Sequence, residues 1–139
     1  SSAISMDKAA TKTICEAAGI PVVPFIAATK TSNVDEIIAK SEAIYGYPVF
    51  VKPANAGSSV GITKAKDRDE LHSGIKLAFA HDKKLLIEPT IVGREIEVAV
   101  CGNDKPISSV CGEIIPNSDF YDYETKYLTQ KAYSGGNPP

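Results

Sequence analysis

A strand, a loop of small residues and a return strand follow one another near the middle of the chain, and they restrict the fold more than any other segment. Residues 48–51 form a continuous apolar run that ends at Lys52 and Pro53. Its length and its β-branched content predict a buried strand. After the loop 54–61, residues 62–65 have the pattern of a second strand, so the sequence predicts an antiparallel hairpin here.

Helical patterns alternate with these and further strands. Three segments have the spacing of amphipathic helices, and each begins at residues that can cap a helix: Ser5 or Asp7, Asn33, and Asp67. Another strand is expected at 84–88, and a second hairpin is expected from 95–101 and 107–115. Helices mixed with antiparallel hairpins predict the α+β fold class.

Composition narrows the classes of function. The 139 residues are 43% hydrophobic and 23% charged, which suffices for a packed core. A net charge of −2 without a basic block argues against a nucleic-acid partner. The sequence has no apolar run of transmembrane length and does not open on a signal-peptide pattern, so no membrane partner is expected. Three cysteines without a Cys-x-x-Cys spacing favour reduced thiols in a cytoplasmic protein.

Lys52 and the loop that follows it are the first candidate site. A lysine at the end of a buried strand either extends to solvent or binds an anion. The loop adds Gly57, Ser58, Ser59 and Gly61, whose backbone N–H groups and hydroxyls suit phosphate oxygens. It matches neither a Walker A loop nor Gly-x-Gly-x-x-Gly. A hairpin tip without a ligand is the alternative interpretation.

Acidic residues near two strands leave further alternatives open. Glu88 is either a solvated strand end or the start of a hinge whose backbone pairs with a purine edge. Glu95 and Glu97 share one face of a strand, where they are either solvated or, for one of them, bound to ribose hydroxyls. Spacing alone decides neither case.

The segment from residue 117 to residue 139 is polar but rich in tyrosine. Long aromatic and charged loops of this kind are often lids. Its carboxylates Asp119, Asp122 and Glu124 lack the defined spacing of a hard-cation site, so no metal ligand is expected in the chain.

Four blocks of sequence, in this order, resemble D-alanine–D-alanine ligases of the ATP-grasp superfamily. They are residues 6–8; 49–53 with 57–61; 86–88 with 93–95; and 120–127. The resemblance implies an α+β ATP-grasp fold in which helices pack on a mostly antiparallel sheet. It assigns residues 1–93 to the central ATP-grasp subdomain, and 94–139 to the first hairpin and mobile loop of the C-terminal subdomain.

The resemblance also implies a reaction and a nucleotide site. The family's enzymes join two D-alanines for peptidoglycan synthesis, using ATP and magnesium, through an acyl phosphate. By resemblance, three lysines contact the nucleotide and its phosphates: Lys8, Lys52 and Lys126. The loop that closes on the phosphates contains Gly57, Ser59 and Val60.

The remaining roles that the resemblance implies concern the nucleotide's adenosine and the closing of the active site. The hinge from Glu88 to Ile91 would contact adenine, and Glu95 would bind ribose. Ser58 and Tyr127 match two members of a hydrogen-bonded catalytic group whose third member lies in the family's N-terminal domain.

Two departures from the family limit what the chain is expected to do. The family's magnesium ligands include a Glu-x-Asn pair, and no such pair occurs in the 139 residues. The family's N-terminal domain, which holds much of the first D-alanine site, has no counterpart here. We therefore expect a fragment that is inactive alone, from a homodimeric parent enzyme that uses ATP and Mg²⁺. The alternatives are a D-alanine–D-serine or other ATP-grasp carboxylate–amine ligase, and a non-catalytic nucleotide-binding module.

Overall fold

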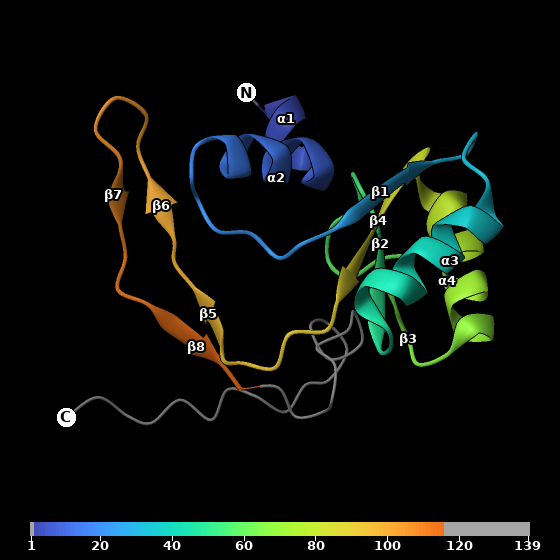
Figure 1. Ribbon diagram of the computed structural model, residues 1–139. Helices are drawn as coiled ribbons and strands as arrows, with labels where there is room; N and C mark the ends of the chain where they lie inside the picture. Colours follow the sequence, from blue (N-terminus) through green and yellow to red (C-terminus); the bar gives the residue numbers. More distant parts are fainter. Residues whose placement is uncertain (1, 116–139) are drawn as a thin grey trace. The chain divides into compact units, whose positions relative to one another are not determined.

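The structure, a computed structural model, describes residues 2–115. The chain divides into two compact units, Ser1–Ile91 and Val92–Pro139. The division falls two residues before the boundary expected from the sequence, and the assignment of the units to two ATP-grasp subdomains stays a prediction. Helices are combined with antiparallel sheets, which confirms the α+β fold class (Figure 1).

A four-stranded antiparallel sheet forms the centre of the first unit. Its strands are β1 (Ile26–Thr29), β4 (Lys84–Pro89), β2 (Val49–Pro53) and β3 (Thr63–Ala65), in that spatial order. Val51 is opposite Thr63 on one side and Ile87 on the other. The hairpin expected between residues 48 and 65 is therefore confirmed, and β4 inserts between it and β1.

Helices α3 (Val34–Tyr45) and α4 (Arg68–His81) cover one face of this sheet (Figure 1). Asn33 caps α3 and Asp67 caps α4, as expected, because their side-chain oxygens accept hydrogen bonds from backbone N–H groups of the first helical turn. The main core lies between these helices and the sheet, and it contains Ile38, Leu71, Ile75, Val49, Val51, Leu85 and Ile87.

The first helix expected from the sequence, with Ser5 or Asp7 as its cap, is α2 (Lys8–Ala17), and a shorter helix, α1 (Ser2–Met6), precedes it. Asp7 separates them, because its carboxylate accepts hydrogen bonds from the N–H groups of Ala9 and Ala10 and so caps α2. Helix α2 covers part of the opposite face of the sheet, where Ala9 packs with Ala54, Leu86 and Phe25. This second cluster is much smaller than the main core.

The second unit, as far as residue 115, is an exposed hairpin. Strand β5 (Glu95–Glu97) pairs with β8 (Gly112–Ile114), and β6 (Val100–Cys101) pairs with β7 (Ile107–Ser108). Between these pairs one side of the hairpin has one residue more than the other, which is the signature of a β-bulge. The two strands expected from the sequence are thus each broken in two.

No helix within residues 2–115 has the length and apolar character needed to cross a bilayer.

Candidate functional site

The sheet face opposite α3 and α4 carries polar side chains from the same strands that build the core. Successive residues of a strand point to opposite faces, and directly opposed residues of neighbouring strands share a face. Phe50 is opposite Glu88, and Lys52 is opposite Leu86. Lys52 and Glu88 therefore lie on the face that α2 partly covers.

Glu88 is the centre of this face. Only 4% of the residue is exposed, and its carboxylate is bonded at both oxygens. Lys52 Nζ lies 2.6 Å from Oε2, and Lys12 is paired with Oε1. Burial acts to raise the pKa of Glu88, but hydrogen bonds from Lys12 and Lys52 outweigh it and hold the pKa below its ordinary value. The structure thus holds Glu88 as a buried, ionised acceptor.

Lys12 is a member of this cluster that sequence reasoning missed. Its Nζ donates a hydrogen bond to the backbone oxygen of Val23 at 2.9 Å and lies 5.4 Å from the centre of the Phe25 ring. Lys12 follows Lys8 by four residues in α2, and this spacing places both lysines on one side of the helix. This spacing from Lys8 was the one signal in the sequence that could have identified Lys12 as a site residue.

Lys8 lies over the end of β2. Its Nζ donates to the backbone oxygens of Pro53 at 3.4 Å and Ala54 at 3.3 Å, and also to that of Ala56. Burial lowers the pKa of Lys8, and the nearby charge of Lys52 lowers it further. The structure therefore brings Lys8, Lys52 and Glu88, which are far apart in the sequence, into one electrostatic group.

The loop after β2 has a constrained backbone. Ser58 and Ser59 both have positive φ, at 51° and 63°, and Gly61 has φ 70°. Non-glycine residues in this region store local strain, and such strain is concentrated at ligand clamps and active sites. A Cβ on Gly61 would lie 2.6 Å from Cδ2 of His81, so the end of the loop is closely packed.

The other residues singled out from the sequence fall in the loop after β2, at the end of the first unit, in the second unit, or outside the described part of the chain. Val60 donates its N–H to the oxygen of Gly57 within the loop. Ile91 ends the first unit and is 62% exposed. Glu95 is exposed on β5 in the second unit, so it is not placed relative to Glu88. Lys126 and Tyr127 lie beyond residue 115, as do Asp119, Asp122 and Glu124.

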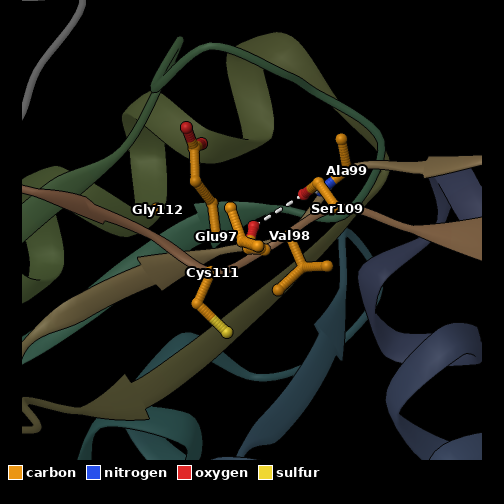
Figure 2. Close-up of a pocket in the computed structure, with 7 residues that line it drawn as sticks. Glu97, Val98, Ala99, Ser109, Cys111 and Gly112 are labelled. Carbon is orange, nitrogen blue, oxygen red and sulfur yellow. Dashed lines mark hydrogen bonds between the residues drawn. The ribbon is translucent and has the colours of Figure 1, made fainter.

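Two cavities are lined by residues that do not belong to this group. One, of about 410 Å³, opens at the bulge of the hairpin and is lined by residues 97–99 and 109–112 (Figure 2). Another, of about 320 Å³, lies beside β3 and α4. Glu97, which with Glu95 was considered for ribose binding, lines the first cavity, and the second includes no candidate site residue. Among residues 2–115, no three histidine, cysteine or acidic side chains are grouped as metal ligands would be.

The lysine-rich face suits a polyanionic ligand better than any other class. Lys8, Lys12 and Lys52 are joined on the same face by Lys64, whose Nζ lies 5.9 Å from the centre of the Phe50 ring. Glu88 is the carboxylate bonded to Lys12 and Lys52. Lys84 also lies on this face, but its ammonium is paired with Asp7 at 2.6 Å at the start of α2, and it is not counted among the candidate phosphate donors. Lysine ammonium groups and loop N–H groups together are the donors that bind phosphates.

A family match and individual relatives of this chain point to the same protein family. Residues 14–135 match the family described as D-ala D-ala ligase C-terminus. The D-alanine–D-alanine ligase of Streptococcus equi subsp. equi is 48% identical over 128 residues, which are 92% of this chain and 37% of that protein. The chain thus spans little more than a third of the length of the curated relatives it matches.

Solved structures agree with the sequence comparison. The D-alanine–D-alanine ligase from Coxiella burnetii has a TM-score of 0.76 and 39% identity, covering 82% of this chain and 34% of that chain. The VanG D-Ala:D-Ser ligase from Enterococcus faecalis has a TM-score of 0.78 and 40% identity, covering 91% of this chain and 36% of that chain. The fold, the sequence and the family match lead to one conclusion: the chain belongs to the D-alanine–D-alanine ligase family.

Proposed function

We propose that this chain is the ATP-binding part of a D-alanine–D-alanine ligase, which forms the dipeptide through an acyl phosphate. The observation that carries the proposal is the group of Lys8, Lys52 and buried Glu88 on one sheet face, next to a strained loop of serines and glycines. The family match supplies the reaction class.

The polar groups of the first unit fit a nucleoside triphosphate. Lys52 and Lys8 supply positive charge for the phosphates, and the loop 57–61 supplies backbone donors. The hinge from Glu88 to Ile91 is proposed to contact adenine through its backbone N–H and C=O groups. Phosphoryl transfer asks the protein chiefly for such positioning and charge neutralisation.

Magnesium is assigned to no residue of this chain. The ion bridges phosphate oxygens in ATP-dependent enzymes and prefers carboxylate ligands. Residues 2–115 contain no group of three or more acidic, histidine or cysteine side chains that could hold a metal ion, and the proposal places the ion's ligands outside this chain.

The proposal extends to four further residues. Glu95 is proposed to bind ribose and Lys126 a phosphate, while Ser58 and Tyr127 are proposed to close the active site by hydrogen bonding. A closed loop excludes water that would otherwise hydrolyse the acyl phosphate. We further propose that the parent enzyme is a cytoplasmic homodimer of peptidoglycan synthesis, and that this chain alone makes no dipeptide.

A D-alanine–D-serine ligase is a second candidate, because the VanG structure covers 91% of this chain. The two candidates differ in the second substrate. A protein comprising this chain and the remainder of its gene product would distinguish them by its rates with D-alanine, D-serine and D-lactate. D-serine as the preferred second substrate would favour the second candidate.

The proposed function is tested by D-alanine-dependent ATP hydrolysis in that longer protein. We expect hydrolysis that requires D-alanine and is lost in the variant Lys52→Met. Its absence from the unmodified protein would contradict the proposal. For the 139-residue chain alone we expect weak ATP binding by calorimetry, whereas micromolar affinity would favour a stand-alone nucleotide-binding module.

A further inference from the structure

Glu88 is held by two lysines from different elements, one on each carboxylate oxygen. Lys12 belongs to α2 and pairs with Oε1, while Lys52 belongs to β2 and pairs with Oε2 at 2.6 Å. The Glu88 side chain is 5% exposed. A carboxylate buried to this degree is strongly destabilising when it has no counter-charge.

The two lysines are not equivalent. Lys12 has a further acceptor in the backbone oxygen of Val23, and its side chain is 18% exposed. The Lys52 side chain is 27% exposed and stems from the penultimate residue of β2, next to the loop that begins at Ala54. Lys12 is thus the more firmly held partner, and Lys52 is the one nearer to the proposed phosphate site.

We propose that Lys12 is a positioning residue that keeps Glu88 charge-balanced, so that Lys52 can leave this carboxylate for a phosphate group. The inference rests on the proposed function in taking a polyphosphate as the ligand. In the unliganded protein, the carboxylate of Glu88 pairs with the ammonium of Lys52 in the way that a phosphate group would. When the ligand binds, one ion pair of Lys52 replaces another, and the Lys12–Glu88 pair persists.

The consequence is an effect of Lys12 on a ligand that it does not contact. Without Lys12, Lys52 is the remaining cation bonded to a buried carboxylate, and a phosphate must compete with that carboxylate. Loss of a positive charge would by itself also weaken anion binding. The double variant Lys12→Met/Glu88→Gln separates the two causes, because it keeps the wild-type net charge and frees Lys52 from Glu88.

The experiment uses the full 139-residue chain and inorganic tripolyphosphate as the probe, measured by calorimetry at one fixed ionic strength. We expect Lys12→Met to bind tripolyphosphate at least about fivefold more weakly than wild type, because Lys52 is then the one cation that neutralises the buried carboxylate of Glu88. Lys12→Arg should stay within about threefold of wild type, because it keeps the charge. Lys12→Met/Glu88→Gln should bind at least as tightly as wild type.

The pair Lys84–Asp7 provides the matched control. It lies on the same sheet face with a 2.6 Å separation, and Asn at position 7 still caps α2. Lys84→Met/Asp7→Asn removes one cation and one anion without freeing Lys52, so its affinity should stay within about twofold of wild type. Equal gains in the two double variants would overturn the proposal, as would a Lys12→Met/Glu88→Gln variant that binds no tighter than Lys12→Met.

A second measurement needs no ligand. Lys12→Met should lower the Tm more than Lys52→Met does, by roughly 4 °C or more, because Lys12 also bonds Val23. An equal or larger loss for Lys52→Met would contradict the assignment of Lys12 as the fixed partner, and absence of tripolyphosphate binding in every variant would overturn the proposal.

If the longer protein ligates D-alanine but the double variant Lys12→Met/Glu88→Gln shows no recovery of tripolyphosphate binding, this inference fails alone. If recovery occurs but the longer protein shows no D-alanine-dependent ATP hydrolysis, the proposed function fails alone.

Discussion

The two faces of the four-stranded sheet are made by alternate residues of the same strands, yet they do different things. Val49, Val51 and Ile87 enter the main core under α3 and α4. Lys52 and Glu88, from the same two strands, face α2 and bear charge. One face provides stability, and the other uses that stability to hold buried charges in place. A single register therefore fixes both the packing and the site.

Truncation of a core side chain should have the largest effect on stability. Ile87→Ala should lower the free energy of unfolding by about 2–5 kcal/mol, because a fully buried side chain leaves a cavity. Leu86→Ala, one residue away on the other face, is the matched comparison, and we expect a smaller loss because it packs in the smaller cluster. Urea unfolding measures both. An equal loss at the two positions would show that the faces do not differ in packing.

The loop after β2 should respond unequally at its two ends. Gly61→Ala places a Cβ against His81 and Pro53 at positive φ, so it should cost about 1–3 kcal/mol. Gly57→Ala is the control, because a Cβ there meets no described atom within 4 Å and should change stability by less than about 0.5 kcal/mol. Thermal unfolding of both variants tests this, and a tolerant Gly61 would show that the loop end is not packed as described.

Acid should weaken the lysine face before it affects the core face. The pKa of Glu88 lies below its ordinary value of 4.5, so its ion pairs contribute stability that is present above pH 4.5 and lost as the pH falls through the lowered pKa. Asp7, whose pKa is lowered chiefly by its hydrogen bond from Lys84, acts in the same direction. Unfolding midpoints measured between pH 7 and pH 3 should fall, and the fall should be shallower in Glu88→Gln. An identical slope in that variant would show that Glu88 is not the titrating group.

A helix cap on the core face should give the smallest effect. Asp67→Ala removes the carboxylate that accepts the N–H of Glu70 at 2.9 Å, so it should cost about 1 kcal/mol. Asp67→Asn keeps an acceptor and should be nearly neutral. Chemical denaturation resolves the difference, and a loss in both variants would point to the charge rather than to the cap.

Local signals were sufficient for the elements and for part of the site. Asn33 and Asp67 cap helices as expected because capping depends on a few neighbouring residues, and both hairpins form where the turns were expected. The first helix begins after Asp7, which is one of the two caps expected, and the short helix α1 that precedes it was not predicted. Ser5 and Asp7 lie within one helical turn of each other, so the local backbone geometry decides which of the two caps the helix.

Long-range pairing could not be read from the sequence. Glu88 was ambiguous because its partners come from α2 and β2, and only the register of β2 with β4 brings Lys52 to it. Lys12 was missed for the same reason, since its spacing from Lys8 indicates a shared helix side but not a buried carboxylate beneath it. The family resemblance indicated Lys8, Lys52 and Glu88 as one site, and the geometry gives a physical reason for their proximity.

The position of β4 in the sheet has a consequence for the order of assembly. Strands β1 and β2 are not neighbours, because each bonds to β4, the last of the four strands in the chain. During synthesis, the hairpin of β2 and β3 can form while β1 still lacks a bonding partner. The four strands of the first unit can form one sheet only after residues 84–89 have been synthesised, because β4 joins β1 to β2. Folding of the first unit therefore depends on contacts between residues that are distant in sequence.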